Sequence, residues 1–203
     1  MAGTAETTAA RRAAVLDAAT GVFLRYGFKK TSMDDLARAA GLSRQGLYLQ
    51  FSTKEALFKE AVLNVIATTR AAGQAALARP DLDVEERLLN AFEAVHGHAV
   101  GKPGSEHMNE LLETATDLVG SVFDDLEQGL VADVARTLRG AGIANRWKPG
   151  GVSAKDLAEH LYVTSYGVKH RVSTHADYRD RMRMAVRIVC RGPAAEAIGR
   201  RGA

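Results

Sequence analysis

Residues 32–54 read SMDDLARAAGLSRQGLYLQFSTK, and the predicted fold is built around them. Ser32 precedes a run of helix-forming residues, and Asp35 stands three positions later, as in a capping box. Gly41 has no Cβ and therefore ends a helix easily in the left-handed conformation. Ser43 then offers a side-chain oxygen that caps a second helix. The stretch predicts two short helices joined by a tight turn.

The spacing of small and apolar residues indicates how these two helices pack. Ala37 is small where two backbones approach, Gly41 allows the turn, and Leu47 is an apolar anchor beyond it. This set suits two helices that cross at a steep angle. Such a pair forms the helix-turn-helix motif, whose second helix enters the major groove of DNA. We therefore predict a DNA-binding motif over about residues 32–51.

The composition of the 203 residues favours an all-α protein without a membrane span. Hydrophobic residues make up 46% of the chain, which is enough for a core, and only four prolines interrupt it. The single cysteine, Cys190, excludes an internal disulfide and fits a reducing compartment. No run of eighteen apolar residues occurs, and the first ten residues lack the apolar segment of a signal peptide. We expect a cytoplasmic protein.

Charge is distributed unevenly along the chain. Residues 1–60 contain nine Lys/Arg and six Asp/Glu, residues 61–168 contain nine and fifteen, and residues 169–203 contain nine and three. A basic N-terminal segment suits a polyanion such as DNA. The basic C-terminal segment spreads its arginines around a predicted helix, so we favour a solvated face there over a DNA contact.

Apolar residues at helical spacing predict about nine helices. The first is expected over about residues 8–26, after a frayed arm of residues 1–7. A long helix is expected to start at Ser52, capped together with Glu55, and to end before Pro80. The remaining predicted helices begin near Asp83, Ser105, Val122, Ser153 and Thr174.

The first sixty residues resemble the TetR family of bacterial transcriptional regulators. The resemblance runs from about Arg12 to Leu63 and spans three predicted helices with fixed spacing. The residues that carry it are Ala18-Ala19, Phe23, Tyr26-Gly27-Phe28, Thr31-Ser32-Met33, Leu36-Ala37, Ala40-Gly41-Leu42-Ser43, Leu47-Tyr48, Phe51 and Lys54-Glu55-Ala56-Leu57. The rest of the chain matches the family only in its layout of several helices.

The resemblance implies a homodimer that binds the two half-sites of a near-palindromic operator in double-stranded DNA. It implies a helix-turn-helix domain over residues 1–60, joined by the long helix to an effector-binding and dimerisation domain over residues 61–203. A small-molecule effector would release such a repressor from DNA, and no cofactor is implied. Two alternatives stay open: a dimeric regulator controlled by a partner protein or by its abundance, and an activator.

The predicted recognition helix departs from the family pattern at two positions. Gly46 stands one position after the place where glycine is commoner, and Gln50 stands where many members carry histidine or tyrosine. Gly46 costs the helix about 1 kcal/mol relative to alanine, but it lets the backbone approach DNA closely. The operator sequences of relatives therefore do not transfer to this chain.

Arg44 and Gln45 are the candidates for base recognition. Arginine binds guanine O6 and N7 with two hydrogen bonds, and glutamine binds adenine N6 and N7 in the same way. Two alternatives are open at these positions. Arg44 either reads a base or meets only phosphate, and Leu49 either touches a thymine methyl group or packs beneath Tyr48 or Phe51.

Phosphate contacts are predicted from residues that flank the recognition helix. Lys54 lies in the first turn of its helix, where the helix dipole also favours an anion, and Tyr48 offers a hydroxyl. Thr31 and Ser32 are further candidates, although Ser32 serves equally as a helix cap. The complete predicted DNA-binding set is Thr31, Ser32, Ser43, Arg44, Gln45, Gly46, Tyr48, Leu49, Gln50 and Lys54.

Two further sets of residues are predicted in the larger domain, mainly on the strength of the resemblance. Aromatic residues and methionine at helical spacing suit either a packed core or an apolar effector pocket. The pocket candidates are Phe92, Met108, Phe123, Trp147, Tyr162 and Tyr166. The apolar seam of the last two helices suits either a four-helix bundle with a second subunit or packing within one chain. The interface candidates are Leu157, Leu161, Val168, Tyr178, Met182, Ala185 and Val189.

The sequence lacks the patterns of an enzyme or a metal site. Serine, histidine and aspartate occur without a nucleophile-elbow context, and no phosphate-binding glycine loop is present. His96, His98 and His107 do not have the spacing of metal ligands. Cys190 lies near a helix end among arginines, where it is either a thiol sensor or, as we favour, a structural cysteine.

Overall fold

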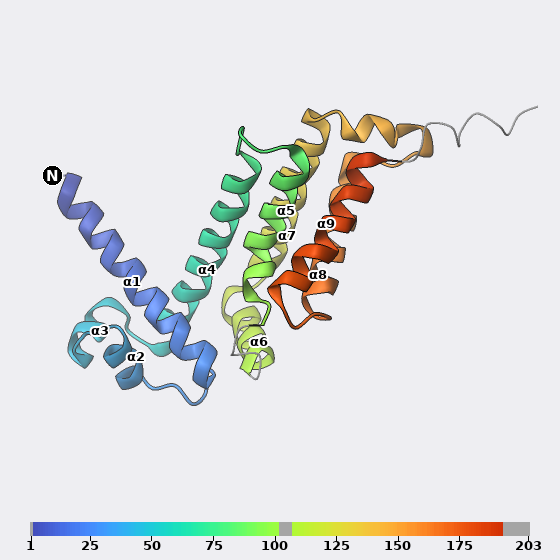
Figure 1. The fold of residues 1–203 in the computed structure, drawn as a ribbon. Helices are drawn as coiled ribbons and strands as arrows, with labels where there is room; N and C mark the ends of the chain where they lie inside the picture. Colours follow the sequence, from blue (N-terminus) through green and yellow to red (C-terminus); the bar gives the residue numbers. More distant parts are fainter. Residues whose placement is uncertain (1, 102–106, 193–203) are drawn as a thin grey trace, which may run out of the picture. The chain divides into compact units, whose positions relative to one another are not determined.

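The computed structural model describes residues 2–101 and 107–192 and, within those ranges, all side chains except those of residues 2–8, 98 and 109. Every regular element in these ranges is helical, which confirms the all-α prediction and its nine helices (Figure 1). The α-helices are α1 (Ala2–Tyr26), α2 (Met33–Ala39), α3 (Arg44–Gln50), α4 (Lys54–Leu77), α5 (Val84–Val95), α6 (Met108–Val119), α7 (Val122–Gly140), α8 (Ala154–Lys169) and α9 (His175–Arg191). Short 3-10 helices lie at η1 (Gly97–Ala99), η3 (Ile143–Arg146) and η4 (Lys148–Gly150). In the part of the chain that the structure describes, none of the helices is both long and apolar enough to cross a membrane.

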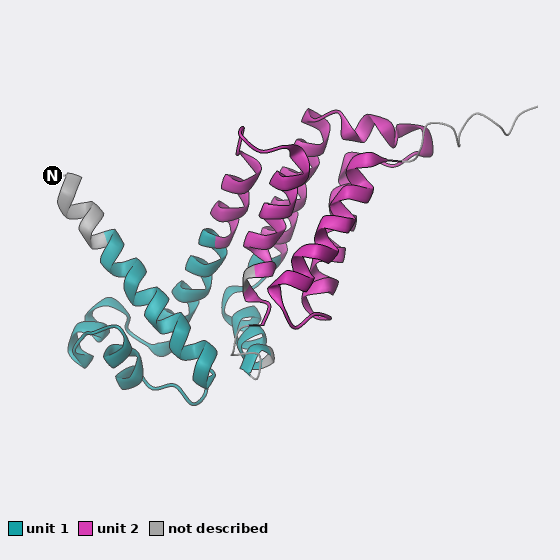
Figure 2. Ribbon diagram, in the orientation of Figure 1, with its two compact units in different colours: residues 1–68, 102–123 teal, residues 69–101, 124–203 magenta. Residues whose placement is uncertain are grey.

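The chain divides into two compact units (Figure 2). Unit 1 comprises residues 1–68 and 102–123, and unit 2 comprises residues 69–101 and 124–203. Helices α1, α2, α3 and α6 belong to unit 1, whereas α5, α8, α9 and most of α7 belong to unit 2. Helix α4 contributes residues to both.

An apolar core holds the helices of unit 1 together. Phe23 of α1 and Phe58 of α4 meet edge to face with ring centroids 5.0 Å apart, and Phe28 packs on Phe58 at the same distance. Leu36 of α2 and Leu47 of α3 have no exposed surface. Burying a leucine side chain contributes about 1.5–3 kcal/mol, so one leucine anchors each of the two short helices to the core.

Most of the predicted helix caps form. Ser32 and Asp35 make the two reciprocal bonds of a capping box, and Gly41 has a φ of +65° at the end of α2. The remaining predicted caps whose side chains accept an N–H from the first helical turn are Ser43, Asp83, Ser153 and Thr174. The local chemistry of these residues therefore determines where the helices begin.

Two helix starts differ from the sequence prediction. Helix α1 begins at Ala2 because an alanine-rich segment continues the helix where the sequence predicts a frayed arm. Helix α4 begins at Lys54, and Thr53 rather than Ser52 caps it, accepting the Ala56 N–H at 3.1 Å. Phe51 is extended and buried at the end of α3, which moves the cap one residue along the chain. The start predicted near Ser105 lies outside the described residues.

Most of the apolar seam of α9 lies in the core of its own chain, which is the second of the two sequence alternatives, whereas Val168 and Ala185 are only partly buried. Tyr178 and Met182 have no exposed surface, because α9 packs against both α5 and α8 of the same chain. A side chain that is buried within one chain cannot also contact a second. All of the predicted interface residues lie in this core or pack against it: Leu157, Leu161, Val168, Tyr178, Met182, Ala185 and Val189.

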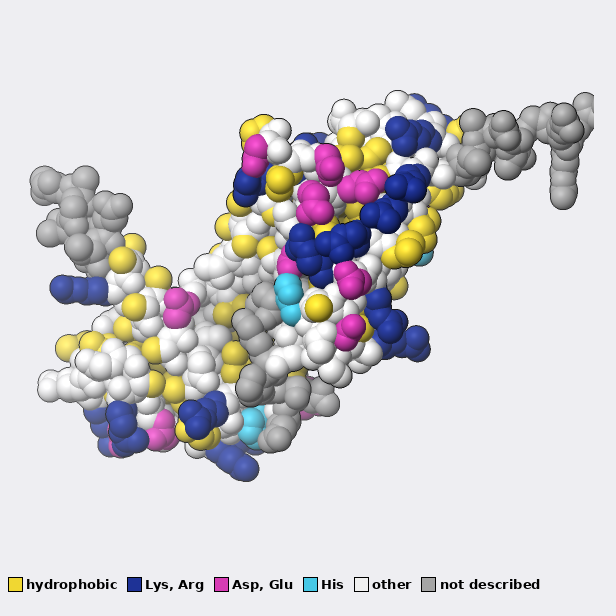
Figure 3. Space-filling model, in the orientation of Figure 1, with side chains coloured by type: hydrophobic (Ala, Val, Ile, Leu, Met, Phe, Trp, Pro, Cys, Tyr) yellow, Lys and Arg dark blue, Asp and Glu magenta, His cyan; other side chains and the backbone are white. Residues whose placement is uncertain are grey.

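Ion pairs link α5 to α9 along their shared edge, where basic and acidic side chains alternate on the surface (Figure 3). Glu93 accepts from Arg179 and lies 2.6 Å from His175, and Glu86 lies 3.1 Å from Arg179. Some of the arginines of the basic C-terminal segment therefore face carboxylates of the acidic middle segment. This pairing fits the prediction of a solvated face better than a second DNA-binding surface.

Candidate nucleic-acid interface

The turn between α2 and α3 is fixed by backbone hydrogen bonds. The Leu42 N–H donates to the Ala37 carbonyl at 2.9 Å, and the Gly41 N–H donates to the Arg38 carbonyl at 3.2 Å. These two bonds and the positive φ of Gly41 form a Schellman motif, which closes the end of α2. Ser43 then accepts the Gly46 N–H at 3.0 Å and starts α3. The angle between α2 and α3 is thus set by residues on both sides of one glycine.

Helix α3 presents nearly all of its side chains to solvent. Of its seven residues, all of which are described, Leu47 alone is buried. Leu49 is 82% exposed and Tyr48 is 41% exposed. Leu49 therefore does not pack beneath Tyr48 or Phe51 in this chain, as one of the two sequence alternatives required. Leu49 is therefore accessible on the outer face of α3.

A hollow of about 360 Å³ lies beside α3 on unit 1. It brings together five residues of the predicted DNA-binding set with two others, and its lining consists of Thr31, Ser32, Met33, Asp34, Arg44, Tyr48 and Lys54. Gln45, Leu49 and Gln50 lie on exposed parts of α3 outside this lining, and Ser43 and Gly46 form the cap. The hollow joins two cations and a phenol hydroxyl, which are the groups that bind phosphate oxygens.

Lys54 has a role that the sequence did not reveal. Its ammonium group donates to the carbonyl oxygens of Phe28 and Thr31 at 2.9 and 3.0 Å, and it lies 4.4 Å from the centroid of the Phe28 ring. Lys54 therefore clamps the loop between α1 and α2 to the start of α4. An ammonium group has three N–H donors, so one remains for an anion in the hollow.

The two hydroxyls at the start of α2 are already bonded within the chain. Thr31 is 3% exposed, and its Oγ1 donates to the Gly27 carbonyl at 2.6 Å. Ser32 Oγ donates to Asp35 Oδ2 at 2.6 Å, and this bond is the main cause of the lowered pKa of Asp35. Their positions suit a structural role at the edge of the hollow.

Comparison with known proteins finds transcriptional regulators that are similar to the helix-turn-helix segment. The sequence model described as "Bacterial regulatory proteins, tetR family" matches residues 15–61, which include α2, the turn and α3. The uncharacterized HTH-type transcriptional regulator YfiR of Bacillus subtilis (strain 168) is 44% identical over 52 residues, 26% of this chain and 25% of that protein. The HTH-type transcriptional repressor ComR of Escherichia coli (strain K12) is 34% identical over 84 residues, 41% of this chain and 40% of that protein. Over residues 15–61 the chain is therefore similar to the TetR family of regulators.

Solved structures extend the likeness in fold over most of the chain. Reduced E. coli NemR aligns with a TM-score of 0.68 at 16% identity, covering 91% of this chain and 100% of that one. The TetR-family regulator PfmR from Thermus thermophilus aligns with a TM-score of 0.57 at 23% identity, covering 89% and 98%. The matched sequence relatives are aligned over less than half of their own length. The family model matches residues 15–61, whereas the likeness in fold covers most of the chain.

Gly46 departs from the commoner TetR-family pattern, and the structure supplies a local reason for glycine. A Cβ at this position would lie 3.1 Å from Ser43 Oγ, the atom that accepts the Gly46 N–H. Any side chain here would therefore press on the cap of α3. The sequence alone explains Gly46 only by a close approach of the backbone to DNA.

Arg44 is held by two neighbours on unit 1. Its Nε lies 3.2 Å from Asp34 Oδ1, and its guanidinium carbon lies 5.7 Å from the centroid of the Tyr48 ring. The Arg44 side chain is 65% exposed, so its outer edge stays accessible. Nothing in the sequence pattern singled out Asp34, which is adjacent to the capping-box residue Asp35.

Helix α6 reaches the region between α1 and α2 within unit 1. Glu110 Oε1 accepts the Lys29 N–H at 2.7 Å, and a Cβ at Gly27 would lie 2.8 Å from Glu110 Oε2. Gly27 has a φ of +78° at the end of α1. The positive φ therefore favours glycine there, and an added side chain would also make the Glu110 carboxylate shift.

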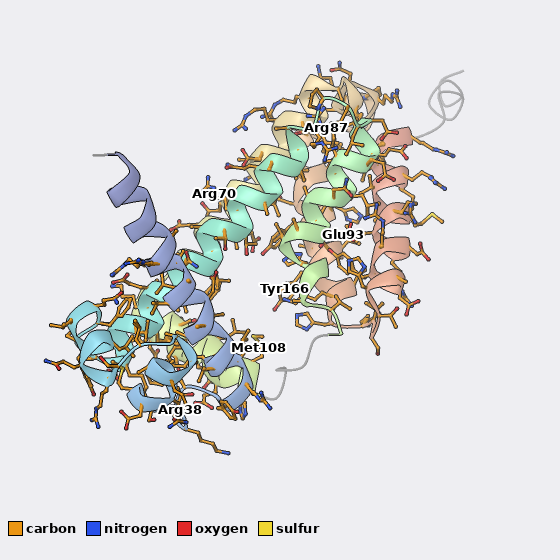
Figure 4. All side chains as sticks on the ribbon, turned by 60° about the vertical axis from the view of Figure 1, so that its left-hand side comes forward. Arg38, Arg70, Arg87, Glu93, Met108 and Tyr166 are labelled. Atoms are coloured by element: carbon orange, nitrogen blue, oxygen red, sulfur yellow. The ribbon has the colours of Figure 1, made fainter. Side chains whose placement is uncertain are left out.

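The predicted effector-pocket residues are divided between the two units, and Figure 4 labels one from each, Met108 of α6 and Tyr166 of α8. Met108 of α6 and Phe123 of α7 belong to unit 1, where Phe123 packs against the core. The other candidates, Phe92, Trp147, Tyr162 and Tyr166, belong to unit 2. Neither unit therefore contains all six of the predicted pocket residues.

Within unit 2 the four remaining candidates have different surroundings. Phe92 is fully buried in the core, and Trp147 Nε1 donates to the Val189 carbonyl at 2.9 Å. Tyr162 is partly buried, and burial followed by the charge of Glu127 raises its pKa to about 12. Tyr166 is 50% exposed. Tyr162 thus combines partial burial with a nearby carboxylate, that of Glu127.

A buried hydrogen-bonded chain runs beside these residues in unit 2. Tyr178 Oη donates to the Phe92 carbonyl at 3.0 Å and contacts Ser165 Oγ at 2.6 Å, and Ser165 Oγ contacts His96 Nδ1 at 2.7 Å. Because the Tyr178 proton is used on Phe92, Ser165 donates to Tyr178 and must accept from His96. Proton counting therefore places a hydrogen on His96 Nδ1.

Proposed function

We propose that this chain is a TetR-family transcriptional regulator that binds a near-palindromic operator as a homodimer and represses transcription until a small-molecule effector releases it. One observation carries the proposal. A capped, glycine-dependent turn and the buried Leu47 fix α3 on unit 1, while its outer face is exposed. The E. coli relative ComR is named as a repressor, which supports repression as the direction of control.

Base recognition is assigned to the exposed face of α3. Arg44 and Gln45 occupy the first turn of α3, and both are exposed. Arginine on guanine or glutamine on adenine discriminates each base by about 1–3 kcal/mol. Leu49, which is 82% exposed, is suited to a thymine methyl group. This arrangement reads two or three adjacent bases per half-site.

Phosphate binding is assigned to the hollow beside α3. The Tyr48 hydroxyl and the third N–H of Lys54 supply two donors in the same hollow, and Arg44 lies at its edge. Charge-assisted hydrogen bonds of this kind position a protein on the DNA backbone without reading sequence. The hollow therefore sets the register, and α3 reads the bases.

Homodimerisation is assigned to an exposed apolar surface of α8 and α9. Val163 and Tyr166 on α8 are 66% and 50% exposed, and Met184 and Ile188 on α9 are each 57% exposed. The two helices pack against each other, so a second copy that covers them would form a four-helix bundle. Sedimentation should give a dimer at micromolar concentration, and Ile188→Glu should shift it to a monomer. A wild-type monomer under these conditions would remove the dimer from the proposal.

Effector binding is assigned to the part of unit 2 around Tyr162. Its partly buried phenol lies near Glu127, and its ring centroid is 5.2 Å from that of His96. An effector that binds better to the arrangement that cannot bind DNA would shift the population and release the operator.

The experiment that tests the function is selection of bound sequences from a random double-stranded DNA library, followed by binding to the winner across a salt series. We expect an inverted repeat whose enrichment is lost in Arg44→Ala or Gln45→Ala. Lys59→Ala, an exposed lysine on α4 outside the hollow, is the matched control and should keep the selected sequence. If no motif is enriched and binding to every sequence is weak and salt-sensitive, the chain is not a sequence-specific regulator.

The alternative of a regulator without an effector is favoured by one feature of unit 2. Phe92, Leu161 and Met182 have no exposed surface, as expected of a fully packed core. A thermal-shift screen separates the alternatives, because a ligand present at 100 times its Kd stabilises the folded state by about 2.7 kcal/mol. A stabilising compound that also releases the operator supports the effector. A compound that does neither leaves control to a partner protein or to abundance.

A further inference from the structure

A carboxylate lies among the cationic groups of the hollow beside α3. Asp34 lines the hollow together with Arg44, Tyr48 and Lys54. Its Oδ1 lies 3.2 Å from Arg44 Nε, and the two side chains are 52% and 65% exposed. A surface that only had to attract phosphate would be weakened by this negative charge.

Asp34 is not needed for the cap of α2, because its neighbour Asp35 forms the capping box with Ser32. Exposed ion pairs add little to folding stability. Asp34 also places a negative charge in the first turn of α2, but Asp35 supplies the same charge there, so the pair of Asp34 and Arg44 adds little to stability. The pair does change the direction of the Arg44 side chain and the net charge of the surface around it.

The geometry leaves Arg44 able to read a base. Asp34 engages Nε, the inner nitrogen of the guanidinium group, and Tyr48 lies beside the guanidinium with its ring centroid 5.7 Å from the central carbon. Neither contact occupies the two terminal nitrogens, which form the bidentate bond with guanine O6 and N7. The side chain is thus partly ordered before DNA arrives.

We propose that Asp34 is a positioning residue that gives α3 its sequence specificity by directing Arg44 to a base edge and away from phosphate. This inference rests on the proposed DNA-binding function. The carboxylate lowers the attraction of Arg44 for phosphates of any sequence. It also reduces the rotamer freedom that Arg44 loses when it binds the correct base.

The test compares Asp34→Asn with the wild type on two DNA duplexes of equal length, the selected operator and a scrambled sequence. The amide keeps the size of the side chain and removes its charge. We expect scrambled DNA to bind more tightly, with a salt slope steeper by about 0.9, the value of one additional phosphate contact. Operator affinity should change little, so the ratio of the two affinities should fall by about fivefold to tenfold, part of the discrimination of one base pair.

Three controls separate positioning from general electrostatics and from folding. Glu55→Gln removes an exposed carboxylate outside the hollow and should leave the ratio unchanged. Asp34→Glu should restore most of the ratio, because it restores the charge. In an Arg44→Ala background, Asp34→Asn should no longer change the ratio. Circular dichroism checks that each variant is folded.

The outcomes distinguish this inference from the proposed function. A wild-type protein that selects no sequence overturns the proposed function and this inference with it. A wild-type protein that selects an operator, with a ratio that Asp34→Asn does not change, overturns only the role of Asp34. An equal gain of affinity for both duplexes also overturns it, because Asp34 would then act as a general repulsive charge.

Discussion

Replacing Lys54 with methionine should destabilise unit 1 even in the absence of DNA. The ammonium group bridges the carbonyls of Phe28 and Thr31 and packs over the Phe28 ring. Methionine retains most of the apolar stem and loses all of these polar contacts. A lysine that served only to bind phosphate would instead be solvated in the free protein, and its removal would leave folding unchanged.

The expected magnitude follows from the contacts. A hydrogen bond to a charged group contributes about 1.5–3 kcal/mol. Lys54 is only partly buried, so each of its two bonds falls at or below the lower end of that range. The cation–π contact adds about 0.5–1 kcal/mol, and hydration of the freed carbonyls offsets part of the loss. We expect a net loss of about 2 kcal/mol, which moves a urea midpoint by about 1 M at an m-value of about 2 kcal/mol/M.

Urea unfolding followed by two signals provides the assay. Far-UV circular dichroism reports the helices of both units, whereas fluorescence of Trp147, the single tryptophan, reports unit 2. Lys59→Met is the matched control, since it replaces an exposed lysine on the same helix. A dichroism midpoint for Lys54→Met within about 0.25 M of the control would correspond to less than 0.5 kcal/mol and would refute the clamp.

Three further predictions concern the cap, the buried chain and the thiol. Ser43→Ala should cost about 1 kcal/mol in urea unfolding and weaken operator binding, because it removes the cap of α3. Ser165→Ala should cost about 1–3 kcal/mol in the same assay, because Tyr178 and His96 both lose a buried partner. Burial raises the pKa of Cys190 from 9.0 to about 12, so the unfolded chain loses the thiol proton first and the free energy of unfolding should fall as pH rises from 9 to 12. Cys190→Ala should reduce that slope in alkaline denaturation.

The parts of the fold that depend on local chemistry could be predicted from the sequence. A capping residue and a glycine act over three or four positions, so Ser32, Gly41 and Ser43 set where α2 begins and ends and where α3 begins, while Leu36 and Leu47 anchor the two helices in the core. The cap of α4 was displaced by one residue, from Ser52 to Thr53, because Phe51 is buried and extended. That burial depends on tertiary contacts, which local patterns do not contain.

The sequence named residues that the structure brings together in the hollow, but not the contacts that each of them makes. The hollow brings together Lys54, Arg44 and Tyr48, as the sequence indicates, yet the bonds of Lys54 to Phe28 and Thr31 cross more than twenty positions. Asp34 escaped notice because its partner Arg44 lies on the next helix. A pattern along one helix names the residues that face outward, and only the crossing of two helices shows which of them meet.

The seam of α9 shows where helical periodicity stops being informative. Steps of four, three and four along Tyr178, Met182, Ala185 and Val189 require an apolar neighbour but do not say whose helix it is. In the structure that neighbour is the chain's own core. A surface for a second copy must then come from side chains that remain exposed after this packing. Ile188 meets that requirement, because it is 57% exposed and lies one turn from Met184. It is not one of the seam residues that helical spacing identified. The candidates for an interface between identical chains are therefore the apolar residues of a helix that stay exposed once the chain has folded.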